Sequence, residues 1–214
     1  MTVLEAMNLS HRYGSYQALA PMDFSIAEGE IVVVEGPNGS GKTTLMLCLS
    51  GLIHPTSGNI QICGHNLFSD ETEAMRCLAF SPDVPRFYME MTAWEHVRFI
   101  ARAHGMGNEF EERAEELLKE FGIWEARQLL PHHFSRGMSL KLGLVLALIR
   151  PFRVLLLDEP TSAMDHESKM QLVRHLSTLR ETGAGILLST HDLSLKNGLA
   201  DKVWFMKEGH LRAD

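Results

Sequence analysis

The 214-residue sequence is poor in cysteine, lacks a C-x-x-C pair and carries no excess of positive charge. Its three cysteines, Cys48, Cys63 and Cys77, stand at unrelated spacings, which argues against a zinc site or a disulfide framework and predicts reduced thiols in a cytosolic protein. The formal net charge of −7 argues against a protein that coats nucleic acid or anionic lipid. We therefore expect no nucleic-acid partner.

A membrane span, a signal peptide and internal repeats are also missing from the pattern. The longest apolar run, residues 142–149, is far shorter than the roughly 20 residues that a span needs. The first ten residues include Glu5 and no continuous apolar stretch, so we expect no signal peptide. The length and a hydrophobic content of 45% instead predict one large globular domain, or one with a small inserted lobe, that would serve a membrane only through a partner.

The strongest motif is a glycine-rich stretch that fits the pattern G-x-x-x-x-G-K-S/T, with Gly36 and Gly41 as its outer glycines. Apolar residues 31–34 precede it and residues 45–49 follow it, which predicts a buried strand, a tight turn and a helix. Such a turn lets successive backbone N–H groups converge on an anion at the positive end of the helix. We expect Lys42 to reach the β- and γ-phosphates of a nucleoside triphosphate, and the Thr43 hydroxyl to bind Mg²⁺. The residues assigned to nucleotide binding in this stretch are Gly36, Asn38, Gly39, Ser40, Gly41, Lys42, Thr43 and Thr44.

Strand patterns occupy both ends of the chain, and helical patterns fill its middle from residue 83 to about 150. The first three predicted strands form a small, mostly antiparallel sheet, with residues 11–14 in a turn from which the Tyr13 ring could stack on a base. Two of the helices are expected to begin at capping boxes, at Thr92 and at Asn108. Strands are predicted at residues 3–9, 24–27, 31–35, 59–63, within 74–80, and at 154–157, 185–189, 203–206 and 210–212.

Polar residues follow two strands whose apolar character suggests a parallel sheet. Asp158 and Glu159 end the strand at residues 154–157, and His191 follows the strand at 185–189. Ligands of parallel α/β sheets lie beyond the carboxyl ends of the strands, so we expect these side chains to face the glycine-rich loop. Asp158 would then share a metal with Thr43, and Glu159 would orient and polarise the attacking water. His191 would register the γ-phosphate. The alternatives are a solvent-facing turn for the carboxylates and a structural role for the histidine.

Phe134-Ser135-Arg136-Gly137-Met138 precedes an apolar helix and resembles the signature motif of the ATPases of ATP-binding cassette (ABC) transporters, usually Leu-Ser-Gly-Gly-Gln. With it, the resemblance covers essentially the whole chain. It implies a P-loop NTPase of ABC type: an α/β fold with a RecA-like, mainly parallel sheet, an N-terminal antiparallel β subdomain and an inserted helical subdomain. Residues 1–82 and 151–214 would form the catalytic core, and residues 83–150 the helical subdomain.

The same resemblance assigns further roles. Tyr13 would stack on adenine, Asp165 would belong to the D-loop and His191 would be the switch histidine. Two ATPase subunits of this family pack head to tail, so Ser135, Gly137 and Met138 would complete the site of a second subunit, in a homodimer or a heterodimer. The implied ligands are ATP and Mg²⁺. The implied partners are integral-membrane permease subunits encoded as separate chains, with this chain peripheral on the cytoplasmic face of the membrane.

Two residues depart from the usual motifs of the family. Asp83 stands at the hinge position that is usually Gln, where a carboxylate could still meet the metal, and Arg136 replaces the middle glycine of the signature. This combination is similar to the short exporter ATPases of the drug-resistance, sodium-efflux and lantibiotic-immunity branch. One alternative is a soluble ABC-type ATPase that acts as a nucleotide-dependent clamp in translation or DNA repair. Another is a cassette that binds ATP without appreciable turnover.

Overall fold

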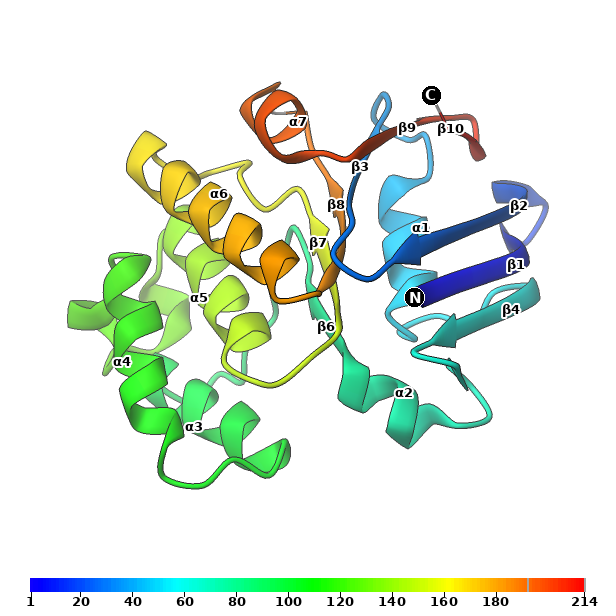
Figure 1. Ribbon diagram of the computed structural model, residues 1–214. Coiled ribbons are helices and arrows are strands. Elements are labelled where there is room, and N and C mark those ends of the chain that lie inside the picture. The colour runs from blue at the N-terminus through cyan, green and yellow to red at the C-terminus, as the bar shows by residue number, and fades with distance from the viewer. Residues whose placement is uncertain (192, 214) are drawn as a thin grey trace.

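Two sheets, with helices between and around them, make up the computed structural model, which describes residues 1–191 and 193–213 (Figure 1). The smaller sheet is antiparallel, with strand order β2-β1-β4-β5. The larger sheet has the order β10-β9-β3-β8-β7-β6, and every neighbouring pair in it is parallel except β10–β9. The strands are β1 (Thr2–Tyr13), β2 (Tyr16–Ala27), β3 (Ile31–Glu35), β4 (Ser57–Ile62), β5 (His65–Asn66), β6 (Leu78–Ser81), β7 (Val154–Asp158), β8 (Gly185–Ser189), β9 (Lys202–Lys207) and β10 (His210–Ala213).

The helices cover both faces of the larger sheet. Helix α1 lies between the two sheets, whereas α5 and α6 lie on the other face, with α3 and α4 beyond α5 (Figure 1). The helices are α1 (Lys42–Leu49), α2 (Glu71–Cys77), α3 (Ala93–Ala103), α4 (Phe110–Glu120), α5 (Arg136–Leu148), α6 (His166–Glu181) and α7 (Leu193–Leu199), with 3₁₀ turns at Trp124–Ala126 and Pro131–His133. The predicted α/β fold, with a mainly parallel sheet and a separate antiparallel one, is confirmed.

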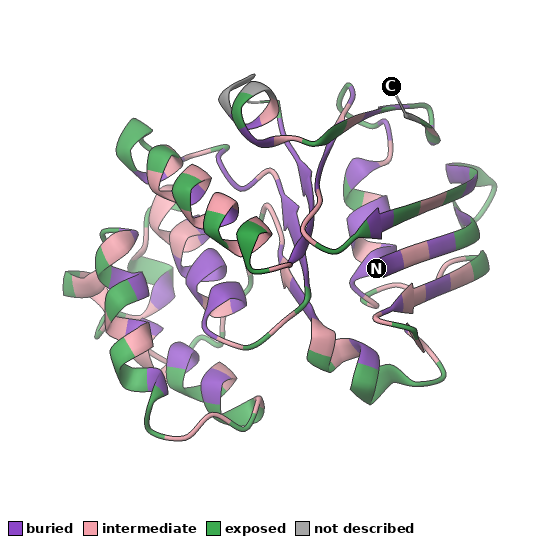
Figure 2. Ribbon diagram, in the orientation of Figure 1, coloured by how far each residue is buried: buried purple, intermediate pink, exposed green. Residues whose placement is uncertain are grey.

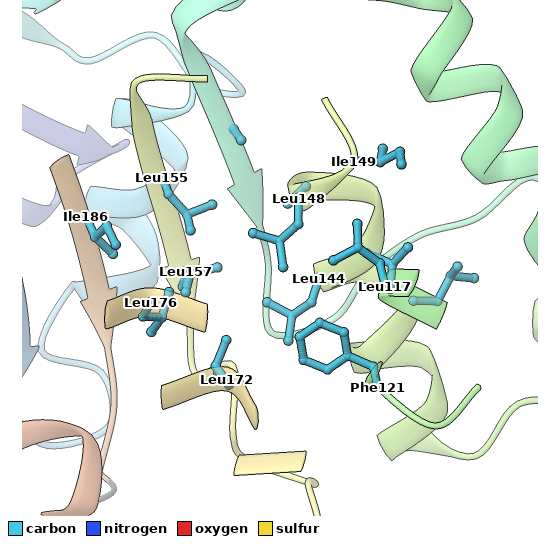
Figure 3. Packing of buried hydrophobic residues seen from close by; sticks show 14 of the residues in the cluster. Leu117, Phe121, Leu144, Leu148, Ile149, Leu155, Leu157, Leu172, Leu176 and Ile186 are labelled. Carbon is cyan, nitrogen blue, oxygen red and sulfur yellow. The ribbon is translucent and has the colours of Figure 1, made fainter. Parts of the chain in front are cut away.

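The central strands are buried on both faces because their side chains alternate between two apolar cores. In β3, Ile31 and Val33 belong to the core under α5 and α6, and Val32 and Val34 to the core between the sheets. The first core runs without a break from β7 and β8 through α5 to Phe121, at the end of α4 (Figure 3). Exposed residues lie on the outer sides of α4 and α6 (Figure 2). The sheet is thus a rigid platform for the loops at its strand ends.

The position of β3 differs from the prediction. It lies in the parallel sheet, because four consecutive buried residues leave no polar face for the edge of a small antiparallel sheet. The antiparallel sheet instead contains β4 and β5 beside β1 and β2. The turn predicted at residues 11–14 is also shorter than expected, since β1 runs through Tyr13 and only Gly14 and Ser15 turn. The short helices α2 and α7 were not predicted.

One of the two predicted capping boxes is confirmed. The Thr92 hydroxyl accepts from the Glu95 N–H at 3.2 Å, and the Glu95 carboxylate accepts from the Thr92 N–H at 2.8 Å. The prediction at Asn108 is wrong, because α4 is preceded by Glu109 and the Asn108 amide oxygen accepts from the Arg102 guanidinium at 2.5 Å. A charged donor from α3 thus takes the place of the backbone donor that a cap would satisfy.

Candidate active site

The glycine-rich loop between β3 and α1 passes so close to two other strands that only glycine fits at its ends. A Cβ on Gly36 would lie 2.0 Å from the Met206 carbonyl oxygen, and one on Gly41 would lie 2.7 Å from that of Ala18. Both glycines also have positive φ, 149° and 110°. The loop is therefore held between β9 and β2.

Two polar side chains of this loop indicate that the site binds an anionic ligand. Lys42 is 7% exposed, and its ammonium donates to the Gly36 carbonyl at 2.7 Å and to that of Pro37 at 3.4 Å. An ammonium has three N–H donors, so a third remains for a phosphate. The Ser40 hydroxyl is buried and has no hydrogen-bond partner among the residues that the structure describes. A buried, unpaired hydroxyl in such a loop fits a site that a phosphate group completes.

A cleft of about 320 Å³ opens beside the loop. It contains most of the predicted nucleotide residues, together with two that were not predicted, Tyr16 and Ala18. Tyr16 lies directly across the β1–β2 hairpin from Tyr13, and the two rings are 60% and 49% exposed. The two-residue turn at Gly14 and Ser15 was the signal for this pairing, but a longer turn was expected. The cleft is lined by Tyr13, Tyr16, Ala18, Asn38, Gly39, Ser40, Gly41, Lys42, Thr43, Thr44, Asp83 and Glu159.

Asp158 and Glu159 are tied to the neighbouring strand through Ser189. The parallel register of β7 and β8 sets Asp158 beside Ser189, whose hydroxyl donates to Asp158 Oδ1 at 2.6 Å. The same hydroxyl oxygen accepts from the Glu159 N–H at 2.9 Å. Asp158 itself is 1% exposed. Ser189 was missed as a site residue, although a hydroxyl at the end of an otherwise apolar strand was a signal for it.

Glu159 has the geometry and the electrostatics of a general base. Its φ of 47° is in the left-handed region, which a non-glycine residue adopts only where the surroundings enforce it. Burial raises the pKa of its carboxyl group. Electrostatic interactions with Asp158 and Asp83 also raise this pKa, and those with His191 and Lys42 oppose the shift. Glu159 Oε1 lies 3.2 Å from His191 Nε2. A carboxylate with a raised pKa beside a phosphate-binding loop is suited to accept a proton from water.

The residues that were assigned to Mg²⁺ fit the chemistry of that ion. Mg²⁺ is usually held by one or two carboxylates together with substrate phosphates and waters. Within residues 1–191 and 193–213, no group of three or more histidine, cysteine and acidic side chains could hold a metal alone. Thr43 offers a hydroxyl in the cleft, and Asp158 offers a buried carboxylate at the end of β7, against which α1 packs. The donor set therefore fits an ion that is shared with phosphate oxygens.

The stretch from Phe134 to Met138 begins α5 instead of preceding it. Ser135 is the N-cap, and its hydroxyl accepts from the Met138 N–H at 3.2 Å. Gly137 lies in the first turn, whose N–H groups have no partner inside the helix, and a Cβ there would be 2.6 Å from the Ala163 carbonyl oxygen. The Met138 side chain packs against the apolar core. The N-terminal turn of a helix favours anions.

The N-terminus of α6 lies beside this helix. Asp165 caps α6 by accepting from the Ser168 N–H at 2.8 Å, and its carboxylate pairs with Lys141 of α5 at 2.8 Å. These contacts lower the pKa of Asp165, with the Lys141 hydrogen bond as the largest cause. Among the described residues, neither Ser135, Gly137 nor Asp165 lines the cleft of its own chain. The structure therefore brings together the loop, Tyr13, Glu159 and His191, but not the residues assigned to act on a second subunit.

A glycine-rich phosphate loop, a buried aspartate at a parallel strand end and a desolvated glutamate beside it define the class of P-loop nucleoside triphosphatases. The family described as "ABC transporter" matches residues 19–162, so the chain belongs to that family. It is 35% identical to the SkfA peptide export ATP-binding protein SkfE of Bacillus subtilis, over 100% of this chain and 89% of SkfE. It is 34% identical to the bacitracin transport ATP-binding protein BcrA of Bacillus licheniformis, over 98% of this chain and 69% of BcrA.

Solved structures agree with the family. An ATP-binding subunit of an ABC transporter superposes with a TM-score of 0.91 at 32% identity, covering 99% of this chain and 90% of that one. A dimeric ATP-binding cassette in a post-hydrolysis state, bound to ADP and Pi, superposes with a TM-score of 0.88 at 25% identity, covering 99% and 97% of the two chains.

The predicted family, fold and activity are thereby confirmed. The chain is an ATP-binding, ATP-hydrolysing subunit of an ABC transporter, and its curated relatives include an ATP-binding protein for peptide export. These findings support transport and not a clamp in translation or DNA repair. None of the helices in the described part of the chain has the length and the hydropathy of a membrane span.

Proposed function

We propose that this chain hydrolyses ATP at a site closed by a second ATPase subunit, and that the cycle drives export through separate membrane subunits on whose cytoplasmic face the chain sits. The observation that carries the proposal is the environment of Glu159, a desolvated carboxylate in the cleft of the phosphate loop, 3.2 Å from His191. The names of SkfE and BcrA support export of a peptide or of an antibiotic.

The residues of this chain have separate roles in ATP binding and hydrolysis. Lys42 and the loop N–H groups hold the β- and γ-phosphates, and Tyr13 stacks on the adenine. Glu159 accepts a proton from the attacking water while His191, beside it, registers the γ-phosphate. Thr43 and Asp158 would hold Mg²⁺, which when bound neutralises charge on the phosphates. We leave Asp83 out of this set, because Arg136 and Ser162 both donate to its Oδ1.

Turnover should depend on pH through Glu159. Only the deprotonated carboxylate accepts a proton from water, and burial raises its pKa above that of an ordinary glutamate. As the pH falls through this raised pKa, kcat should decrease, at a pH above the pKa of an ordinary glutamate. The measurement is steady-state kcat at saturating ATP between about pH 4 and 8. A decrease in kcat only at or below the ordinary pKa of glutamate would contradict the assignment of Glu159 as the base.

The second subunit would contribute the N-terminus of α5. Ser135 and Gly137 lie outside the cleft of their own chain, at a helix end that favours anions. Dimeric cassettes are known among the structural relatives, which supports a head-to-tail pair. In such a pair, Ser135 and the Gly137 N–H of one subunit would close on the γ-phosphate held by the other. The pair is either a homodimer or a heterodimer.

Residues 83–150, proposed as the helical subdomain, carry exposed apolar residues that fit a membrane subunit. Tyr88 and Phe99, which are 59% and 48% exposed, form the patch, and Val84 and Met89 are exposed apolar residues close to Tyr88 in the sequence. Tyr88 and Phe99 contact each other, with ring centroids 5.8 Å apart. The cytoplasmic loops of membrane proteins are rich in Lys and Arg, and this chain has a net charge of −7. We therefore place the docking surface for the permease at this patch.

Tyr88→Glu should block assembly with the membrane subunits, because it puts a charge into a desolvated contact. ATP turnover of the isolated chain should remain unchanged, since Tyr88 is 59% exposed and does not line the cleft. The measurement is co-purification of the chain with co-expressed permease subunits. The matched control is Met170→Glu on α6, a residue that is 40% exposed. Equal co-purification of both variants would rule out the patch as the docking surface.

A further inference from the structure

The two residues that depart from the usual motifs of the family contact each other. Asp83 follows β6, and Arg136 is the first residue of α5. The Arg136 guanidinium donates through Nη2 to Asp83 Oδ1 at 3.1 Å. Two segments that are distant in the sequence are therefore joined by an ion pair at the start of the signature helix.

A third segment completes this contact. The Ser162 hydroxyl, in the loop that follows Glu159, donates to the same Asp83 Oδ1 at 3.0 Å. Arg136 Nη2 also lies 3.4 Å from the Ser162 hydroxyl oxygen. One carboxylate oxygen thus accepts from both side chains, which fixes the direction of the Asp83 side chain. The hinge, the signature helix and the loop after Glu159 meet at this oxygen.

Asp83 also lines the nucleotide cleft, together with Lys42 and Glu159. A carboxylate that faces a triphosphate repels it, because both are negatively charged. The field of Asp83 reaches into the cleft, since its negative charge is one of the causes that raise the pKa of Glu159. The side chain of Asp83 is 33% exposed and that of Arg136 is 64% exposed, so solvent screens the pair only in part.

We propose that Arg136 neutralises Asp83 and thereby makes an acidic hinge residue compatible with a triphosphate in the cleft. Arg136 is in this sense a positioning residue, which acts on the nucleotide affinity of its own chain through Asp83. The inference rests on the proposed nucleotide site. The two can fail separately, because binding by the wild-type chain tests the site and the coupling between Asp83 and Arg136 tests the inference.

The test is a double-mutant cycle with Arg136→Met, Asp83→Asn and the double variant. Methionine keeps the length of the side chain and a good helix propensity, and asparagine keeps an acceptor for Ser162. Equilibrium binding of the non-hydrolysable β,γ-imido analogue of ATP is measured by calorimetry on the full chain at low salt. Arg136→Met should weaken binding about fivefold, the size expected of one partly exposed ion pair. In the Asp83→Asn background, the same change should alter binding by less than about twofold.

Three controls separate this effect from a general loss of structure. Thermal unfolding of each variant confirms that it is folded. Removing the remote pair between Arg76 and Glu73, at 2.9 Å on α2, should leave nucleotide binding unchanged. The weakening caused by Arg136→Met should shrink at high salt, because screening weakens the repulsion.

Repeating the cycle in EDTA distinguishes repulsion of phosphate from coordination of a metal. Repulsion between a carboxylate and a triphosphate needs no Mg²⁺, so the coupling should persist. Coupling that is present only with Mg²⁺ would overturn the inference, and so would equal weakening in both backgrounds or no weakening at all. With Mg²⁺ present, loss of binding in all four proteins, the wild type included, would refute the nucleotide site itself.

Discussion

Replacing Glu159 with Gln should lower ATP turnover by about 100-fold or more, the contribution of a general base, while ATP binding remains intact. The amide is nearly isosteric, so the contact with His191 and the strained backbone at φ 47° can persist. The measurement pairs steady-state ATPase activity with equilibrium binding of ATP. The matched control is Glu35→Gln, which removes an acidic side chain that pairs with Lys196 outside the cleft.

The same variant has an expected effect on stability. The pKa of Glu159 is higher in the folded protein than in an unfolded chain, so stability decreases as the pH rises through the window between the two values. At neutral pH the ionised carboxylate is therefore unfavourable to folding. Glu159→Gln removes that charge and should unfold at the same or a higher temperature. Unchanged turnover would remove Glu159 as the base, whereas lost turnover together with lost stability would point to a structural role.

Replacing Ser135 with Arg should reduce turnover by about 100-fold, comparable to removing a donor to the transition state. The new side chain would lie at the N-cap of α5, where the phosphate of a second subunit is expected to bind. A single chain should still bind ATP within about twofold of wild type, because Ser135 does not line its own cleft. The control His132→Arg adds the same charge on the surface three residues earlier and should stay active. A fully active Ser135→Arg chain would contradict a role in a second site.

The parts of the site that the sequence predicts best are those that local backbone geometry fixes. The loop from Gly36 to Thr44 needs only a strand, positive φ values and a helix, and all of these are encoded within a short stretch. Asp158 and Glu159 were predictable for the same reason, since they directly follow the four apolar residues with which β7 begins. Local patterns of this kind do not depend on how distant segments of the chain pack.

The parts that were missed depend on register and on contacts between distant segments. Ser189 joins Asp158 and Glu159 only because β7 and β8 pair in one particular register. Asp83 and Arg136 were each recognised as unusual, but nothing in the sequence shows that they touch. The prediction at Asn108 failed for a related reason, because a guanidinium from α3 competes for its side chain. Contacts between distant segments decide these cases, and the spacing of residues along the chain does not reveal such contacts.

In the proposed dimer, Ser135 and Gly137 of one chain close on the ATP that the loop of the other chain holds. The ATPase activity of an equimolar mixture of the Glu159→Gln and Ser135→Arg chains tests this arrangement. Each variant alone is expected to be inactive. In a mixed head-to-tail dimer, one site combines an intact Glu159 with an intact Ser135, so the mixture should recover about a quarter of wild-type turnover, because half of the dimers are mixed and each has one intact site of two. A mixture as inactive as the separate variants would contradict a site shared between two copies of this chain.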